Sequence, residues 1–151
     1  MKVSDVMTKA VVMDSSEETL AEAAARMREQ QTGSLLVMDS ERLLGIFTER
    51  DLLKAVASGL DPKQATIKDI MTTDLVTVEP STTLREAAHI MASKWIRHLP
   101  VVDQEKVVGV ISQRDLTGVV AQLLNEPQAE VREGQLVRER RLRRIEAGDL
   151  D

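Results

Sequence analysis

The chain has 151 residues, a net charge of −5 and a pI near 5.2, and this acidity argues against a protein that binds nucleic acid through a broad positive field. It contains no cysteine, which excludes disulfides and thiolate metal sites and favours a reducing compartment. No apolar run approaches the roughly 20 residues of a membrane span, and no secretory signal is visible, so we expect a cytoplasmic protein without a membrane segment.

The first expected elements are a strand and an amphipathic helix. The apolar run at residues 11–13 predicts a short strand, and Ser16 is a candidate cap for the helix that follows. That helix shows the i, i+3, i+4, i+7 spacing of one apolar face at Leu20, Ala23, Ala24 and Met27.

A hairpin and a second helix are expected next. Residues 35–38 and 43–47 are apolar, and the polar stretch 39–42 between them suits a hairpin turn. The second helix is expected to begin at Thr48. The pattern up to this point is therefore β-α-β-β-α.

The same pattern returns 64 residues later. Residues 3–53 align without a gap on residues 67–117, and eighteen of the aligned pairs are identical, which indicates an internal duplication. The second copy predicts a strand at 75–78, a cap at Ser81 or Thr82, a hairpin at 99–111 and a helix from Ser112. We expect an α+β fold of α/β type, in which two β-α-β-β-α repeats, 1–62 and 63–124, pack sheet to sheet with pseudo-twofold symmetry. Residues 125–151 form a charged tail, rich in arginine, that we expect to be helical.

Each copy carries a hydroxyl-x-Arg-Asp sequence where its second helix begins. Thr48 with Asp51, and Ser112 with Asp115, fit a helix cap in which the carboxylate returns a hydrogen bond to the backbone. The same geometry also suits a phosphate at the helix N-terminus and a ribose diol on the carboxylate. Both interpretations remain open at this stage. A positive charge is unfavourable in a first helical turn, so Arg50 and Arg114 favour a functional role.

The two copies differ where the first helix leads into the hairpin. The second copy has Arg97 and His98 there, followed by Pro100, whereas the first has Gly33 and Ser34. A basic helix C-terminus is an ordinary explanation for the charges. A proline in an apolar strand is less ordinary, because it removes a hydrogen-bond donor and belongs at a sheet edge or beside a ligand.

Catalytic motifs are not apparent. The two histidines, His89 and His98, occur in unrelated contexts, and no nucleophile with its base, phosphate-binding glycine loop or metal-binding motif is visible. We expect neither a catalytic residue nor a metal site.

The combination of these motifs resembles a CBS-domain pair, or Bateman module. The resemblance rests on the duplicated unit, on the sequence from His98 to Asp103, and on the segment that begins each copy. We call these segments the lead-ins; they contain Asp5-Val6-Met7-Thr8 and Asp69-Ile70-Met71-Thr72. The whole chain is similar to stand-alone bacterial and archaeal members of this family. The resemblance implies adenosine-type ligands (AMP, ADP, ATP, S-adenosylmethionine and sometimes NAD) in two clefts between the repeats, and a disc-like homodimer.

The resemblance also implies which residues bind the ligand. Asp51 and Asp115 would hold ribose hydroxyls, Thr48 and Ser112 would contact ribose or phosphate, and Arg50 and Arg114 would lie near phosphate. Each cleft would take its adenine contacts from the opposite repeat. The Asp115 cleft would use Ser15, Leu20, Thr32 and Gly33, with Arg97 and His98 facing the phosphates. The Asp51 cleft would use Glu79, Leu84, Ile96 and Arg97.

These observations favour a non-catalytic sensor of adenine nucleotides that signals by changing conformation. The alternative is a scaffold protein with vestigial clefts that docks a protein partner or nucleic acid through the arginine-rich tail. Tight nucleotide binding would distinguish the two. The identity of the nucleotide, the occupancy of both clefts, the partner and the role of the tail do not follow from the sequence.

Overall fold

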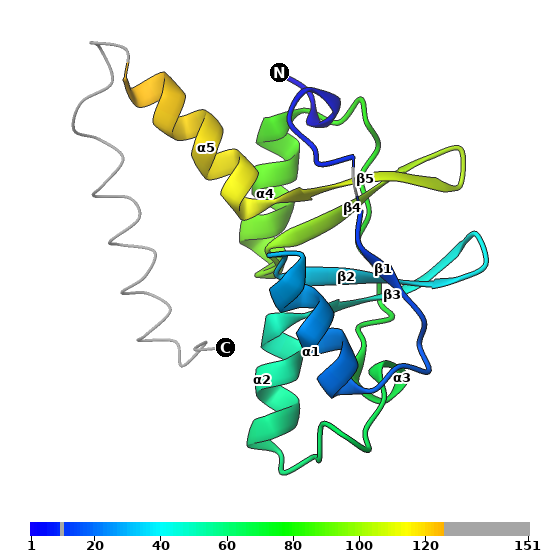
Figure 1. Ribbon diagram of the computed structural model, residues 1–151. Helices are drawn as coiled ribbons and strands as arrows, with labels where there is room; N and C mark the ends of the chain where they lie inside the picture. Colours follow the sequence, from blue (N-terminus) through cyan, green and yellow to red (C-terminus); the bar gives the residue numbers. More distant parts are fainter. Residues whose placement is uncertain (10, 126–151) are drawn as a thin grey trace. The chain divides into compact units, whose positions relative to one another are not determined.

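The computed structural model describes residues 1–9 and 11–125, and its helices and strands follow the predicted order (Figure 1). The first copy contains η1 (Val3–Asp5), β1 (Met13–Asp14), α1 (Leu20–Glu29), β2 (Ser34–Asp39), β3 (Arg42–Thr48) and α2 (Glu49–Ala57). The second contains α3 (Ile67–Ile70), α4 (Leu84–Lys94), β4 (His98–Asp103), β5 (Lys106–Ser112) and α5 (Gln113–Leu124). The short helices η1 and α3 were not predicted. Apart from Asn125, the predicted tail lies outside the described residues.

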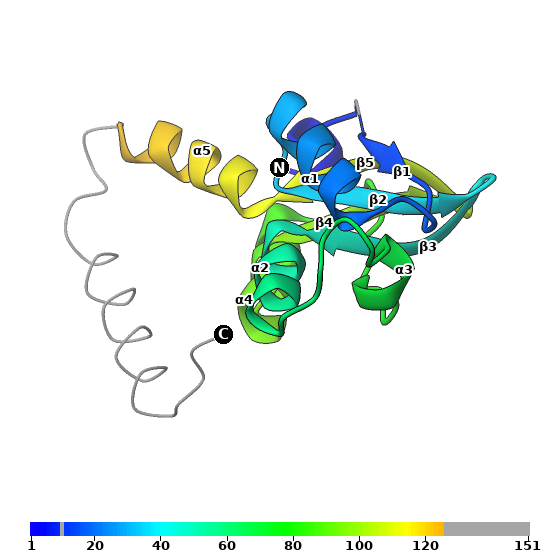
Figure 2. The same cartoon turned by 60° about the horizontal axis from the view of Figure 1, so that its bottom comes forward.

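Both predicted hairpins are confirmed. Strands β2 and β3 pair antiparallel, as do β4 and β5, and each hairpin has a register shift at the same place, after Val37 and after Val101. The turns contain residues with positive φ, Ser40 in the first and Gln104 and Glu105 in the second. Figures 1 and 2 show the two hairpins side by side, with their turns at the end opposite α2 and α4.

The first strand of each copy is formed to a different extent. In the first copy, β1 pairs in parallel with β2 and completes a three-stranded sheet. In the second, only Val78 bridges to Val101, beside the two-stranded sheet of β4 and β5. The backbone N–H of Leu36 donates to the carbonyl of Val12, but Pro100, the counterpart of Leu36, has no N–H to donate. The proline therefore accounts for the strand predicted at 75–78 being reduced to a single bridge.

The first helix of each copy is capped by a threonine and not by the predicted serines. Thr19 precedes α1 and Thr83 precedes α4, and each hydroxyl accepts a hydrogen bond from the backbone N–H three residues on. Glu22 and Glu86 return the bond, which completes a capping box in both copies. The prediction of Ser16 and of Ser81 or Thr82 as caps was wrong, because the threonine next to the helix has the better-placed hydroxyl.

The lead-in segments are exchanged between the copies. Residues 1–8 bond to the second copy: the backbone N–H of Val3 donates to Thr82, and Thr8 forms a bridge with Val110. Residues 65–72 bond in the equivalent way to the first copy, where Ile67 donates to Glu18 and Thr72 bridges Ile46. This exchange ties the beginning of each repeat to its partner repeat.

The hydrophobic cores follow the exchange. One cluster, built by α1, β2 and β3 of the first copy, includes Ile67 from the second lead-in. The other cluster, built by α4, β4 and β5, includes Val3 from the first lead-in. Residues 1–116 form one compact unit, and a second unit begins at Thr117, within α5. The repeat boundary after residue 62 stays a prediction.

Candidate functional site

The two hydroxyl-x-Arg-Asp sequences form helix caps. Oδ2 of Asp51 accepts hydrogen bonds from the backbone N–H of Thr48 at 2.9 Å and from its hydroxyl at 3.1 Å. Oδ2 of Asp115 accepts the same two bonds from Ser112, at 2.7 and 2.8 Å. In each pair the hydroxyl oxygen accepts from the aspartate N–H at 3.3 Å. The capping interpretation is therefore confirmed in both copies.

Capping uses only one of the two oxygens of each carboxylate. Within the described residues, the hydrogen bonds that Asp51 and Asp115 accept on their side chains all end on Oδ2. Both residues are half-buried, so solvent reaches them. A carboxylate has two oxygens and about four acceptor positions. Oδ1 of each aspartate therefore remains an acceptor for a ligand hydroxyl, and the capping and binding interpretations are compatible.

The lead-in threonines lie next to the strands that end in these caps. A Cβ atom built on Gly109 would meet Sδ of Met7 at 2.8 Å and the carbonyl oxygen of Thr8 at 2.9 Å. On Gly45, it would meet the carbonyl oxygen of Thr72 at 2.7 Å. Only glycine permits so close an approach of two backbones. Thr8 and Thr72 thus lie near the two sites, although their sequence motif indicated only the family resemblance.

The junctions between the first helix and the hairpin meet near the start of α2. Nη1 of Arg50 donates to the carbonyl oxygen of Trp95 at 3.1 Å, which connects the Asp51 helix to the second copy. A Cβ atom built on Gly33 would lie 3.3 Å from Oε1 of Glu49 and 3.5 Å from Nε2 of His98. The structure therefore brings Gly33 and His98 together, as the resemblance implies for the Asp115 cleft, and adds Glu49 to them.

The hairpin ends are fixed by equivalent backbone bonds in the two copies. The N–H of Glu49 donates to Gly33 at 3.1 Å, and that of Gln113 donates to Arg97 at 2.8 Å. Thr32 makes a hydrogen bond within its own turn, because its hydroxyl donates to the carbonyl of Ser34 at 3.1 Å. Ile96 is half-buried and packs against the second core.

His98 lies among charges of both signs. Burial lowers the pKa of its imidazole below the ordinary value near 6.5, Glu49 and Asp115 raise it, and Arg97 and Arg114 lower it. Because the net effect is a decrease, the imidazole is mainly neutral at pH 7. In the protein without ligand, His98 therefore offers a hydrogen-bonding group and little positive charge.

One of the adenine contacts implied by the resemblance lies in the core. Leu20 has no exposed surface and belongs to the first hydrophobic cluster, so its side chain does not face a surface open to a ligand. Its counterpart Leu84 is half-buried against the second cluster. Ser15 is exposed, and its hydroxyl accepts from the N–H of Glu17 at 3.3 Å. The adenine contact expected of Leu20 stays a prediction, and the structure shows that this first residue of α1 anchors the helix to the core.

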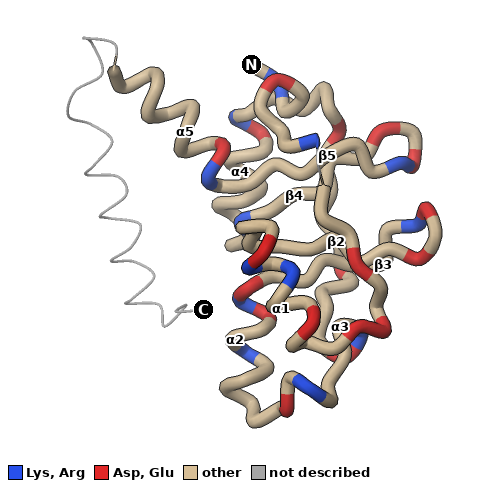
Figure 3. Tube along the Cα trace, in the orientation of Figure 1, with Lys and Arg blue, Asp and Glu red and all other residues tan. Residues whose placement is uncertain are grey.

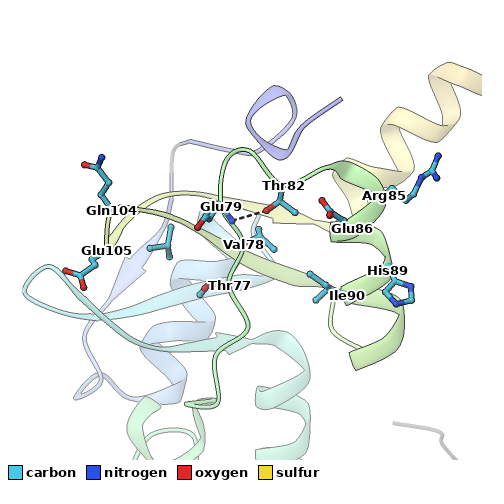
Figure 4. A pocket seen from close by; sticks show the side chains of 11 residues that line it. Thr77, Val78, Glu79, Thr82, Arg85, Glu86, His89, Ile90, Gln104 and Glu105 are labelled. Carbon is cyan, nitrogen blue, oxygen red and sulfur yellow. Dashed lines mark hydrogen bonds between the residues drawn. The ribbon is translucent and has the colours of Figure 1, made fainter.

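Glu79 borders a hollow of about 900 Å³ in the second copy (Figure 4). The hollow lies between the segment 77–82, α4 and the turn between β4 and β5. Its lining includes Arg85, Glu86, His89 and Ile90 but not Asp51, Leu84, Ile96 or Arg97. The structure therefore does not bring Glu79 together in this hollow with the other residues expected in the Asp51 cleft.

A network of charged side chains occupies the equivalent place in the first copy. Arg26, the counterpart of Ile90, donates to Asp14 at 2.7 Å and to Glu18 at 3.0 Å. Asp14 has a fully buried side chain, and its Oδ2 has no hydrogen-bond partner within the described residues. Burial, followed by the neighbouring Glu18, raises the pKa of Asp14 to about 6. In the second copy, the counterparts of Asp14 and Glu18 are the uncharged Val78 and Thr82.

Charges elsewhere in the unit 1–116 are interspersed (Figure 3). Both signs follow one another at the start of α2, in Glu49, Arg50 and Asp51. Within the described part of the chain, no group of three or more histidine, aspartate or glutamate residues is arranged to hold a metal ion. Over the same residues, no helix is long and apolar enough to span a bilayer.

The family model of the CBS domain matches the chain twice, at residues 3–58 and 67–122. The chain belongs to the CBS-domain family. The predicted family and fold class are thereby confirmed, and the chain is a CBS pair, a kind of module that is generally regulatory.

Relatives of the CBS pair include stand-alone proteins and an enzyme. The CBS domain-containing protein YhcV of Bacillus subtilis is 38% identical over 125 residues, which cover 82% of this chain and 87% of YhcV. The inosine-5'-monophosphate dehydrogenase of Nitrosopumilus maritimus is 39% identical over 105 residues, but these are only 21% of that enzyme. The CBS pair of protein MJ0100, in complex with 5'-methylthioadenosine and S-adenosyl-L-methionine, has a TM-score of 0.75 at 27% identity and covers 81% of this chain and 97% of that one.

Proposed function

We propose that this CBS pair binds an adenosine-type ligand in clefts between its repeats and passes on the signal through a change in conformation. The candidate ligands are AMP, ADP, ATP and S-adenosylmethionine, and NAD is a further candidate. The observation that carries the proposal is the duplicated cap, which leaves Oδ1 of Asp51 and of Asp115 available for a ribose hydroxyl. The ligands of the similar MJ0100 pair support an adenosine-type ligand.

The proposed roles of the site residues rest on the family resemblance, and their positions in the structure support them. Asp51 and Asp115 accept from ribose hydroxyls, while Thr48 and Ser112 present the helix start. Arg97, Arg114 and His98 lie near one another and provide the basic groups for a 5′ phosphate. Thr8 and Thr72 are additional candidates, because their backbones border the strands that end in Ser112 and Thr48.

A titration followed by the fluorescence of Trp95 tests the proposal. Trp95 is the only tryptophan, and its carbonyl oxygen is tied to Arg50, beside the junction residues Ile96 and Arg97. Calorimetry with the same ligands is the second measurement. AMP, ATP or S-adenosylmethionine should show saturable binding, and this binding should be lost when Asp51 and Asp115 are both replaced by alanine. A cap substitution costs roughly 0.5–2 kcal/mol, so thermal unfolding must first show that this variant is folded. Absence of binding by the native protein at millimolar ligand would refute the proposal.

We further propose a cytoplasmic homodimer. Helix α2 exposes 68% of Leu53 and 53% of Val56, two apolar side chains one helical turn apart. Apolar patches of this kind mark interfaces, and two-fold dimers are the commonest closed assemblies. A dimer gives the ligand an interface on which to act.

A further inference from the structure

Glu49 lies beside the residues expected to receive the 5′ substituent of the ligand. Although it begins the helix that carries Asp51, its carboxylate is next to Gly33 and His98, both of which were assigned to the Asp115 cleft. The residue is exposed, whereas His98 is half-buried. A molecule bound against His98 therefore meets the carboxylate of Glu49 as well.

The charge of Glu49 opposes the basic groups near it. Arg97 and Arg114 attract a phosphate to the surroundings of His98, but Glu49 and Asp115 repel it from the same place. The repulsion grows with the number of negative charges on the ligand. It becomes an attraction when the 5′ substituent carries a sulfonium or an ammonium group.

The second copy shows that glutamate is not required for the fold at this position. Gln113 is the counterpart of Glu49, and its backbone N–H makes the equivalent bond to the carbonyl of Arg97. Both residues are the first residue of their helix. A neutral side chain of the same size is thus compatible with the helix start, and the carboxylate of Glu49 distinguishes the first copy.

We propose that Glu49 sets the charge preference of the Asp115 cleft, so that this cleft favours adenosine ligands with a neutral or cationic 5′ substituent over those with a polyphosphate. The inference rests on the proposed function, since it assumes that an adenosine ligand binds there. The expected ligand is an adenosine whose 5′ substituent carries no net negative charge, with S-adenosylmethionine as the cationic example.

The test compares the full-length native chain with the variant Glu49→Gln by calorimetry with ATP, AMP and S-adenosylmethionine. Removing the carboxylate should strengthen ATP binding about three- to tenfold and AMP binding less, and should weaken S-adenosylmethionine binding. The measured quantity is the ratio of the ATP and S-adenosylmethionine dissociation constants. The matched control is Glu41→Gln, which makes the same charge change in the exposed turn between β2 and β3 and should leave the ratio unchanged.

Two further outcomes separate the inference from the proposed function. If native chain and Glu49→Gln bind all three ligands with the same ratio, Glu49 does not select the ligand, while the proposed function stands. If neither protein binds any of the three, the proposed function fails and the inference falls with it. The difference between the two proteins should also shrink in about 1 M salt, where charges interact over only about 3 Å.

Discussion

Replacing Asp14 with asparagine should stabilise the protein above about pH 6 and leave its stability unchanged below about pH 4. The side chain of Asp14 is fully buried, and Oδ1 accepts from Arg26 at 2.7 Å and from the N–H of Ser15 at 2.9 Å. Oδ2 is buried without a partner. Asparagine keeps the Oδ1 acceptor, and it places an N–H₂ donor where the protonated acid would have its proton.

The magnitude follows from the pKa of Asp14, which rises from an ordinary 3.8 to about 6 in the folded protein. Between these values the folded state holds the proton more tightly than the unfolded chain, so folding stability falls as the pH rises. Above the folded pKa the cost is complete, and two pKa units correspond to about 3 kcal/mol. This figure is an upper limit, because 28% of the Glu18 side chain is exposed and solvent screens the repulsion by which Glu18 helps to raise the pKa of Asp14.

Urea unfolding of native protein and Asp14→Asn, measured from pH 4 to pH 8, gives the difference in unfolding free energy directly. The difference should grow from near zero to a maximum above pH 6. A second variant transfers the trio of the second copy through Asp14→Val, Glu18→Thr and Arg26→Ile, and should be about as stable as the native protein or more so, as for many replaced buried ion pairs. If the pH dependence of Asp14→Asn equals that of the native protein, the pKa of Asp14 is not raised in the folded state.

Three further predictions concern the clefts and the dimer. Calorimetry with AMP should show that Asp115→Ala removes the tighter site and Asp51→Ala nearly spares it, because charge-assisted contacts from the second copy are worth roughly 1.5–3 kcal/mol each and outweigh the repulsion between Glu49 and a single phosphate; equal losses would contradict this assignment. AMP should bind more tightly as the pH falls from 7.5 to 6, with proton uptake, since a phosphate favours the protonated form of His98; His98→Asn should lose this slope, and an unchanged slope would exclude the histidine. The double variant Leu53→Glu with Val56→Glu should sediment as a monomer at micromolar concentration. A native protein that also sediments as a monomer would refute the dimer.

Local sequence signals predicted much of the secondary structure. The apolar spacing of Leu20, Ala23 and Met27 requires one buried helix face, and all three residues are buried. The polar stretches 39–42 and 103–106 allow only a short turn between two apolar runs, and both became hairpins. The cap predictions for α1 and α4 were wrong because several hydroxyl residues lie close together there. The sequence does not show which of these hydroxyls accepts from the first N–H groups of the helix.

The duplication and the hairpins could be predicted from the sequence alone, since each depends on neighbours within a few residues or on a repeat that alignment reveals. For the two aspartates the sequence indicated a cap or a ligand site, and the structure showed the cap. The tertiary structure decided the rest: the exchange of the lead-ins, the burial of Leu20, and the meeting of Glu49 with Gly33 and His98. It also shows Arg26 occupying in one copy the place that is hollow in the other. These contacts join residues far apart in the chain, and their formation depends on how two similar halves pack together, which no local periodicity encodes.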